Sequence, residues 1–304
     1  MISIYKNKGI TWIDLESPTI DEVKKLMPKY NIPPIVADEL LRPTTRSKIE
    51  IYNNIIYAIL HFPVYDTTRK ISSAHEIDFV VGKNYIITAH SMPIAPLHEI
   101  ARTFEAGLLM GDKKFGKGSG QILSIIIKSL YDFTLRQLDH VYKKTSAIKD
   151  NMFIGKEKEM VKEISYVQGD LIEIKRSVYA HRGVLNSLKV AGEKFFGADF
   201  IFYLNSMMRD LERLEGLIEN SKETIDLLQD TNNSLLSNRT NEIMKVLTVI
   251  AFSTFPLVFL PQVFGMNAKN MPIMGMKGDF WIVVATMISF SLSIIYYFKK
   301  KKWL

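Results

Sequence analysis

The residues of this chain that are best suited to chemistry are Gly265, Met266 and Asn267, which directly follow an apolar run ending at Phe264. A helix that ends at Gly265 presents its last backbone carbonyls, and the side chain of Asn267 adds another carbonyl oxygen. If several copies surrounded one axis, these groups would form a neutral ring of oxygen dipoles. Such a ring suits a Mg²⁺ ion that keeps its water shell, because Mg²⁺ loses water reluctantly. Glycine is also an ordinary helix stop, so the position of the tripeptide decides its meaning.

The element that must position this tripeptide is a helix long enough to cross a bilayer. Val246–Phe264 and Phe280–Phe298 each contain nineteen residues and no charged side chain. About twenty apolar residues in an α-helix cover the hydrocarbon core of a bilayer. The sequence therefore predicts a multi-pass membrane protein with a first span at 244–264 and a second at 280–298. An extracytoplasmic loop at 265–279 joins them and carries the tripeptide.

Basic residues beside the spans predict the orientation of the chain. A short tail at 299–304 begins with Lys299, Lys300, Lys301 and Lys302. Lys and Arg next to a span stay in the cytoplasm, and two spans return the chain to the same side, so both termini are expected inside. The first residues show no signal peptide. We expect an inner or plasma membrane location, with the four lysines contacting the anionic leaflet.

Composition argues against several other classes of protein. Most of the net charge of +7 lies at the C-terminal end, without the interleaved aromatic residues typical of nucleic-acid binding. The absence of cysteine excludes disulfides and thiolate metal sites. No nucleophile–base set and no metal-ligand spacing among the six histidines is visible, so we predict that the chain is not an enzyme. Gly111–Gly118 resembles a phosphate loop but lacks its Ser or Thr, so we interpret it as a connector.

The first hundred residues alternate strand and helix signals. Segments rich in β-branched and aromatic residues predict strands at 10–15, 48–52, 55–62, 77–81 and 85–89. A turn at 82–84 joins the last two strands, and short helices are predicted at 19–29 and 34–41. After Pro96 only helices are predicted, at about 96–110, 120–152 and 157–190. Residues 1–195 are therefore predicted to form an α+β domain with its sheet early and its helices late.

A heptad pattern follows this domain. Leu204, Leu211, Ile218 and Ile225 recur every seven residues, which is typical of a long helix that packs against other helices. We predict a stalk at 196–243 within one continuous helix from Phe200 to the end of the first span, roughly 95 Å long by the 1.5 Å rise per residue. Either a helix of the same subunit or a neighbouring subunit could bury this seam.

The first span has one face that could line a pore. Its residues recur at steps of three or four and are polar at both ends and apolar between, so they could gate water by dewetting. They are Asn241, Met244, Leu247, Ala251, Phe255, Val258 and Gln262. An ordinary helix-packing face is the alternative. Pro256 and Pro261 each free a backbone carbonyl, which hydrocarbon tolerates only beside a packed bundle or water, so they favour a pore modestly.

Several segments resemble the CorA family of magnesium channels. The resemblance is most specific in Asn241–Thr248, in Phe264–Asn267 and in Met271-Pro272. It extends over His61–Tyr65 and Ile77–His90 to nearly the whole chain. This resemblance implies a homopentamer with a cytosolic α/β/α domain, a stalk helix that continues as the pore-lining span, and a Gly-Met-Asn ring as selectivity filter. It also implies that Met244 and Leu247 act as the gate.

The resemblance further implies which residues contact metal. Gly265, Asn267 and Asn241 would contact the hydrated cation in the pore. Cytosolic Mg²⁺ between subunits would hold the channel shut, and Asp210 is the stalk carboxylate we select as its ligand. The chain departs from the family pattern in Phe264, where a tyrosine is usual, and in Phe255 and Val258, where methionine and threonine are frequent. Its outer loop is net positive, so the dipole ring must attract the cation largely without help from carboxylates.

The sequence thus predicts a passive Mg²⁺ uptake channel, driven by the membrane potential and gated by cytosolic Mg²⁺. A transporter of Co²⁺, Ni²⁺ or Zn²⁺ with the same architecture is the first alternative. A membrane-anchored sensor or scaffold that conducts nothing is the second, although no output domain is visible.

Overall fold

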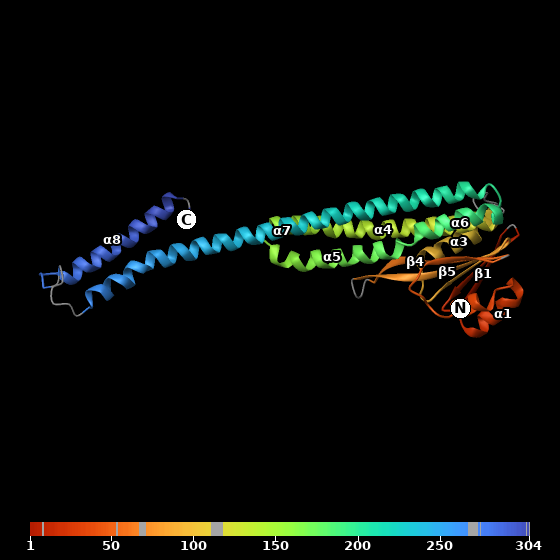
Figure 1. The fold of residues 1–304 in the computed structure, drawn as a ribbon, viewed down its shortest axis with the longest axis horizontal. Helices are drawn as coiled ribbons and strands as arrows, with labels where there is room; N and C mark the ends of the chain where they lie inside the picture. Colours follow the sequence, from red (N-terminus) through yellow and green to blue (C-terminus); the bar gives the residue numbers. More distant parts are fainter. Residues whose placement is uncertain are drawn as a thin grey trace. The chain divides into compact units, whose positions relative to one another are not determined.

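The computed structural model describes residues 1–304 except 8, 53, 67–70, 111–117, 267–272, 274, 302 and 304, and the side chains of 106–110. The chain forms two compact units, Met1–Gln229 and Asp230–Leu304 (Figure 1). The predicted connector at Gly111–Gly118 lies almost wholly outside the described residues.

The first unit is built on a mixed sheet of six strands in the order β1-β2-β6-β5-β4-β3. The strands are β1 (Ile2–Asn7), β2 (Ile10–Glu16), β3 (Lys48–Ile51), β4 (Ile56–Asp66), β5 (Ile71–Val81) and β6 (Tyr85–His90). Only β2 and β6 pair in parallel; the other neighbours are antiparallel. The five predicted strands and the turn between β5 and β6 are confirmed. The sequence-based prediction missed β1, an edge strand paired with β2.

Helices cover both faces of this sheet, which confirms an α/β/α sandwich. Helices α1 (Ile20–Tyr30) and α2 (Pro34–Glu39) share a core on one face with Ile13 and Val80, among others. Thr19 and Glu22 form a capping box that starts α1. On the other face, Trp12 meets Phe104 of α3 (Ala95–Met110) edge-on at 6.0 Å. Alternate strand residues thus point to opposite helical layers.

The other face also carries α4 (Ser119–Phe153), whose Tyr131 lies 5.8 Å from Phe62 of β4, ring to ring. The single helix predicted at 157–190 is wrong, because the chain breaks into α5 (Glu157–Val178) and α6 (His181–Phe196). His181 is fully buried at the break; one ring nitrogen lies 2.9 Å from the His61 carbonyl and the other 3.2 Å from the Tyr131 hydroxyl. This tertiary anchor overrides the local tendency to continue the helix.

The stalk and the first apolar run form one helix, α7 (Phe200–Phe264), as predicted. Within the first unit, α7 lies antiparallel to α5: Lys175 bonds Glu219 at 2.8 Å, and Gln168 bonds Gln229 at 2.7 Å. The heptad positions are buried by the subunit itself, which decides between the two alternatives. The buried seam comprises Leu204, Met207, Leu211, Leu214, Ile218, Ile225 and Leu228.

The second unit consists of the remainder of α7 and of α8 (Asp279–Lys300). Among the described residues, these are the two helices that are long and apolar enough to span a membrane. Only 11% of the apolar window in α7 and none of that in α8 is buried, unlike the core helix of a soluble protein. Both predicted spans are therefore present as helices.

Candidate functional site

The helix that carries the predicted filter, α7, ends at Phe264, directly before Gly265. The Gly265 N–H donates to the Pro261 carbonyl at 2.8 Å, and the Met266 N–H donates to the Val263 carbonyl at 3.3 Å. A Cβ atom added to Gly265 would lie 3.0 Å from the Pro261 oxygen, so a larger residue would force the helix end to shift. Asn267 lies outside the described residues, and its role as a filter ligand stays a prediction.

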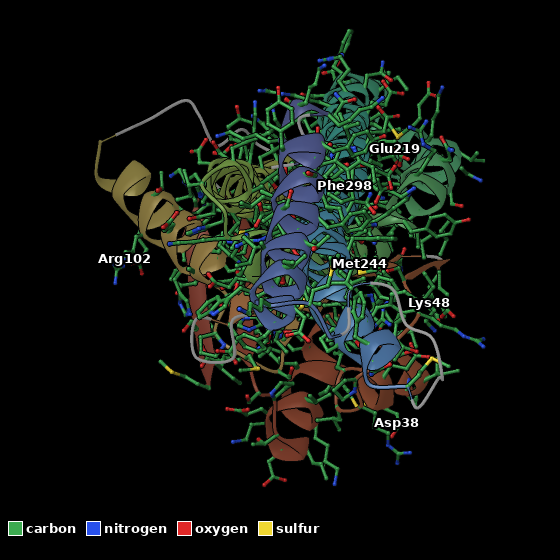
Figure 2. The ribbon with its side chains drawn as sticks, turned by 90° about the vertical axis from the view of Figure 1, so that its left-hand side faces the viewer. Asp38, Lys48, Arg102, Glu219, Met244 and Phe298 are labelled. Atoms are coloured by element: carbon green, nitrogen blue, oxygen red, sulfur yellow. The ribbon has the colours of Figure 1, made fainter. Side chains whose placement is uncertain are left out.

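All seven residues of the predicted pore face are exposed in the single chain. Met244, Leu247 and Phe255 keep 54 to 58% of their surface, whereas Val249 keeps only 4%. Because an α-helix has 3.6 residues per turn, Val249 and Pro256 point roughly opposite to the predicted face. The buried residues of this part of α7 thus lie on the other side of the helix from the predicted face (Met244 is labelled in Figure 2).

The opposite side of α7 packs against α8. The rings of Phe252 and Phe298 lie 6.2 Å apart, and Ser291 is the most buried residue of α8. Pro256 is buried on this side, so the helical hairpin shields its break in the hydrogen-bond ladder. This proline is explained by packing within the hairpin and gives no support for a pore.

Charges and aromatic rings mark the ends of α8. Asp279 begins the helix and accepts the N–H of Gly275 at 3.3 Å, and Lys299 and Lys300 lie in the last turn. A negative charge at the start of the helix and positive charges at its end interact favourably with the helix dipole. The rings of Trp303 and Phe298 lie 5.4 Å apart in a tilted arrangement, and a tryptophan is expected where a span meets the lipid headgroups. Lys302 lies outside the described residues.

The carboxylates of the stalk are engaged within the chain. The Asp210 carboxylate, the predicted regulatory ligand, lies 3.7 Å from the ammonium of Lys128 on α4. Arg182 of α6 pairs with both Glu212 and Glu215 of α7. In the described part of the chain, no three His, Asp or Glu side chains are arranged to hold a metal. A metal role for Asp210 therefore stays a prediction that requires further ligands.

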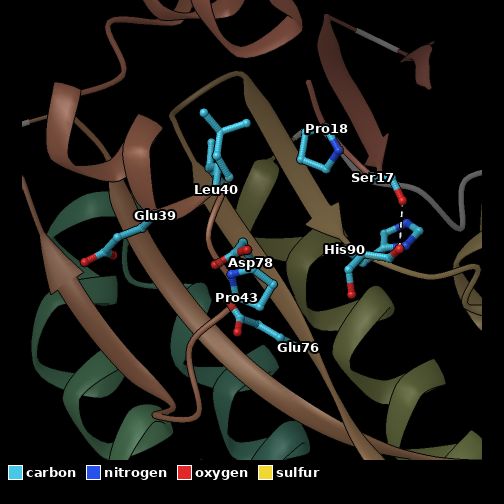
Figure 3. Close-up of a pocket in the computed structure, with 10 residues that line it drawn as sticks. Ser17, Pro18, Glu39, Leu40, Pro43, Glu76, Asp78 and His90 are labelled. Atoms are coloured by element: carbon cyan, nitrogen blue, oxygen red, sulfur yellow. Dashed lines mark hydrogen bonds between the residues drawn. The ribbon is translucent and has the colours of Figure 1, made fainter. Parts of the chain in front are cut away.

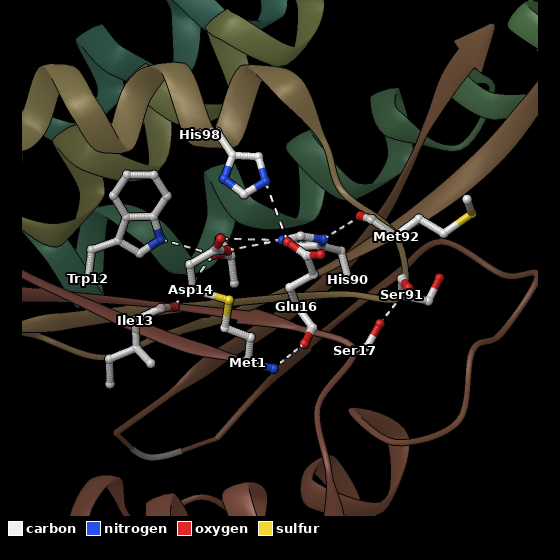
Figure 4. A network of polar contacts seen from close by, with 11 residues as sticks. Met1, Trp12, Ile13, Asp14, Glu16, Ser17, His90, Ser91, Met92 and His98 are labelled. Carbon is white, nitrogen blue, oxygen red and sulfur yellow. Dashed lines mark hydrogen bonds and ion pairs between the residues drawn. The ribbon is translucent and has the colours of Figure 1, made fainter. Parts of the chain in front are cut away.

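Sequence reasoning missed two polar clusters inside the sandwich. Glu39, Glu76 and Asp78 line one cavity on the α1–α2 side of the sheet (Figure 3). On the other side, Asp14 faces the ring of His90 at 3.3 Å (Figure 4). The available signal was a polar residue at every second position of an otherwise apolar strand, which places a polar side chain in a buried layer.

His90 is the centre of the second cluster. Its Nδ1 lies 2.6 Å from the Met92 carbonyl and its Nε2 faces Asp14, and both groups only accept hydrogen bonds. An acceptor at each ring nitrogen favours the protonated form of the ring. Burial by itself lowers the pKa of His90, but the Asp14 carboxylate and the Met92 carbonyl outweigh burial, and the net shift is upward. Thr88 donates to Asp14 and accepts the Trp12 indole N–H at 2.9 Å, which completes the network.

The chain is similar to known transport proteins over nearly its full length. The family described as "CorA-like Mg2+ transporter protein" matches residues 7–300. The cobalt/magnesium transport protein CorA of Thermotoga maritima is 26% identical over 298 residues, covering 97% of this chain and 83% of the relative. The putative metal ion transporter YfjQ of Bacillus subtilis is 23% identical, covering 96% of this chain and 89% of the relative.

Solved structures share the fold. The complete CorA magnesium transporter of Methanocaldococcus jannaschii superposes with a TM-score of 0.86 at 21% identity, covering 99% of this chain and 93% of that one. The full-length CmaX protein gives a TM-score of 0.73 at 15% identity, covering 95% and 88%. Because the family match spans residues 7–300, this chain belongs to the CorA-like Mg²⁺ transporter family: it is a CorA-type divalent cation transporter of the membrane and not an enzyme.

Proposed function

We propose that this chain is the subunit of a passive Mg²⁺ channel in which five copies surround a pore lined by α7. The observation that supports it best is the uncharged face of α7 from Asn241 to Gln262, which is exposed and lies opposite the buried Val249 and Pro256. Such a face suits an axis shared by several copies. The number five rests on the resemblance to the CorA family.

The end of α7 would supply the filter in this assembly. Gly265, Met266 and Asn267 of each copy would place carbonyl oxygens around the axis, where the waters of a hydrated Mg²⁺ donate to them. Below this ring, Met244 and Leu247 would close the pore by excluding water. Two positive charges crossing 100 mV gain roughly 4.6 kcal/mol, which drives uptake without ATP.

The remaining assignments follow from this arrangement. Residues 1–195 form the cytosolic regulatory domain and 196–243 the stalk, and the basic tail from Lys299 holds the C-terminus at the anionic inner leaflet. Cytosolic Mg²⁺ would close the channel by binding between subunits, with Asp210 as one ligand.

Flux into liposomes tests the filter. Purified wild-type protein, Asn267→Ala and the matched loop variant Asn270→Ala are reconstituted with a Mg²⁺-sensitive dye inside, and a voltage is imposed. Asn267→Ala is expected to lower flux at least about tenfold, because each copy loses a charge-assisted hydrogen bond worth about 1.5–3 kcal/mol. Native mass spectrometry checks that both variants stay pentameric. Wild-type flux in a pentameric Asn267→Ala channel would refute the filter.

Transport of cobalt is the second candidate. The relatives from Thermotoga maritima and Methanocaldococcus jannaschii carry the name cobalt/magnesium transport protein. The affinity of a given site for first-row divalent metals generally rises from Mn²⁺ through Co²⁺ to Cu²⁺, so a ring of oxygen ligands does not by itself exclude Co²⁺. Competition of Co²⁺, Ni²⁺ or Zn²⁺ with Mg²⁺ in the same liposomes separates these alternatives. A dimer without any flux would instead support the sensor or scaffold.

A further inference from the structure

A small cavity in the first unit collects carboxylates in a buried layer. It has a volume of about 230 Å³ and lies where α2 and the segment after it cover β5 (Figure 3). Glu39 enters it from α2, and Glu76 and Asp78 enter it from β5. The side chain of Glu76 is only 8% exposed and Asp78 only 5%. Three acids thus share a place with little access to water.

Each carboxylate has one oxygen engaged. The Tyr57 hydroxyl donates to Oδ1 of Asp78 at 2.8 Å, and the Lys48 ammonium donates to Oε1 of Glu39 at 2.7 Å. The backbone N–H of Thr44, between α2 and β3, donates to Oε2 of Glu76. Within the described chain, Oε2 of Glu39 is buried without a hydrogen bond. Of the three carboxylates, only Glu39 has a lysine or arginine within ion-pair distance among the described residues, namely Lys48.

The groups around the cavity do not supply enough positive charge. Lys48 on β3 is the nearest ammonium, and it is shared between Glu39 and Glu50. On β4, Nε2 of His61 lies 3.7 Å from Glu76 and 2.8 Å from the Thr44 carbonyl, and Nδ1 lies 2.8 Å from the Ser47 hydroxyl. The hydrogen bonds of His61 thus go to Thr44 and Ser47 rather than to the carboxylates of the cavity.

The last charged group at the cavity wall belongs to β6. His90 lines the cavity, but its charge is already paired with Asp14 on the other face of the sheet. Full ionisation of Glu39, Glu76 and Asp78 would therefore leave buried charges of one sign without compensation, which proteins avoid by binding protons.

We propose that this cavity is a proton-binding site in which Glu76 and Asp78 hold at least one proton between them at neutral pH, giving the first unit a response to pH. The electrostatics agree: burial and the neighbouring Glu39 raise the pKa of Glu76 to about 7 despite the Thr44 hydrogen bond. Burial and the charge of Glu76 raise the pKa of Asp78 well above its ordinary range. The inference is independent of the proposed ion pathway.

A proton fits this cavity better than a metal ion does. Among the described residues, no group of three acidic or histidine side chains has the arrangement of a metal site. A proton needs only one carboxylate oxygen, and the hydrogen bonds that the described residues make to Glu76 and Asp78 go to Oε2 and Oδ1, respectively. Loss of the proton would place a full charge beside the Thr44 N–H, so the segment between α2 and β3 is the part of the fold expected to respond.

Infrared difference spectroscopy of the full-length protein in detergent tests the proposal. The pH is raised from about 5 to about 9. Exposed carboxyl groups have pKa values near 4, so they are already ionised over most of this range and contribute little to the difference spectrum. In the wild type, the carbonyl band of a protonated carboxylic acid is expected to disappear with a midpoint near neutral pH. Glu76→Gln should remove or displace this midpoint. Asp38→Asn, which alters the exposed neighbour of Glu39 on α2, should leave it unchanged.

Three further outcomes decide the matter. A wild-type protein without any carboxyl that titrates near neutral pH would overturn the proposal, and so would a midpoint left unchanged by both Glu76→Gln and Asp78→Asn. If saturating Mg²⁺ at constant pH abolishes the band, the cavity is a metal site and the proposal is wrong. Thermal unfolding provides the check on folding: Glu76→Gln should melt at or above the wild-type temperature at pH near 8, because it removes a buried charge.

Discussion

The ammonium of Lys128 on α4 lies 3.7 Å from the Asp210 carboxylate on α7 and 3.1 Å from the Ser206 hydroxyl. A positive charge of the chain itself thus stands beside the stalk carboxylate that we selected as a regulatory metal ligand. A divalent cation could bind there only by displacing Lys128 or by approaching from the other side.

Replacement of Lys128 by alanine should therefore increase Mg²⁺ binding at Asp210. Both side chains are more than a third exposed, so the loss of the pair should cost under about 1 kcal/mol of unfolding free energy. The rise in melting temperature caused by Mg²⁺ should be larger in Lys128→Ala than in the wild type. Lys175→Ala, which breaks the Glu219 pair on the same stalk, is the matched control. Equal Mg²⁺ responses in all three proteins would remove Asp210 from the regulatory site.

Substitution of Gly120 or Gly192 should destabilise the protein, because the ring of Phe200 packs closely against both glycines. A Cβ atom at Gly120 of α4 would lie 2.7 Å from the Phe200 ring, and one at Gly192 of α6 would lie 2.4 Å from it. Each alanine variant should cost about 1–3 kcal/mol through overpacking at the start of α7. Gly169→Ala on α5 meets nothing within 4 Å and should be neutral or stabilising. Denaturant unfolding of the full-length protein compares the unfolding free energies of the three variants. Equal stability of all three would contradict tight packing of Phe200 against Gly120 and Gly192.

His90 should make the stability of the first unit depend on pH. Its folded-state pKa is raised, so the ion pair with Asp14 contributes fully below the unfolded pKa of about 6.5 and is lost as pH rises through the folded pKa. His90→Gln leaves Asp14 buried without its partner and should cost about 3 kcal/mol or more at pH near 6. Unfolding across the pH range measures both effects. His98→Gln, at a half-exposed histidine, should retain the wild-type slope above neutral pH; a retained slope in His90→Gln would exclude the ion pair as its source.

Leu247 should control the leak of the proposed pore. A polar hydroxyl at this position allows water into an apolar constriction, so Leu247→Ser should raise resting Mg²⁺ flux into liposomes by about tenfold or more. Leu257→Ser changes the same residue type on the same helix at a position off the proposed pore face, and 41% of Leu257 is exposed. Its flux should match the wild type. If both variants leak equally, Leu247 does not line the pore.

Much of the architecture could be predicted because local patterns carry it. The two spans follow from uninterrupted apolar length, and the single helix α7 follows from a heptad without proline or a glycine-rich break up to its membrane part. The strands of the sheet follow from β-branched residues between turns. The sequence-based prediction omitted edge strand β1 although Ile2, Ile4 and Tyr5 favour a strand, and its pairing with β2 reveals it in the structure.

For the candidate site, too, some features could be predicted from the sequence and others could not. Gly265 and the spacing of the pore face were readable in the sequence because helical periodicity alone places Met244 and Leu247 on one side. Only the tertiary structure identifies what packs against each face of α7. Val249 and Pro256 are buried on the side of α8, and the stalk seam around Leu211 is buried by the subunit itself. Spacing states which residues share a face, but it does not state what covers that face.

By itself, the sequence determined the membrane spans, the long helix and the position of the tripeptide, since these depend on length, period and residue type within one segment. Only the tertiary structure decided that Lys128 faces Asp210, that His181 breaks a helix and that Glu39, Glu76 and Asp78 share one cavity. The physical reason is that charge and burial act through space, between residues that are far apart in the chain.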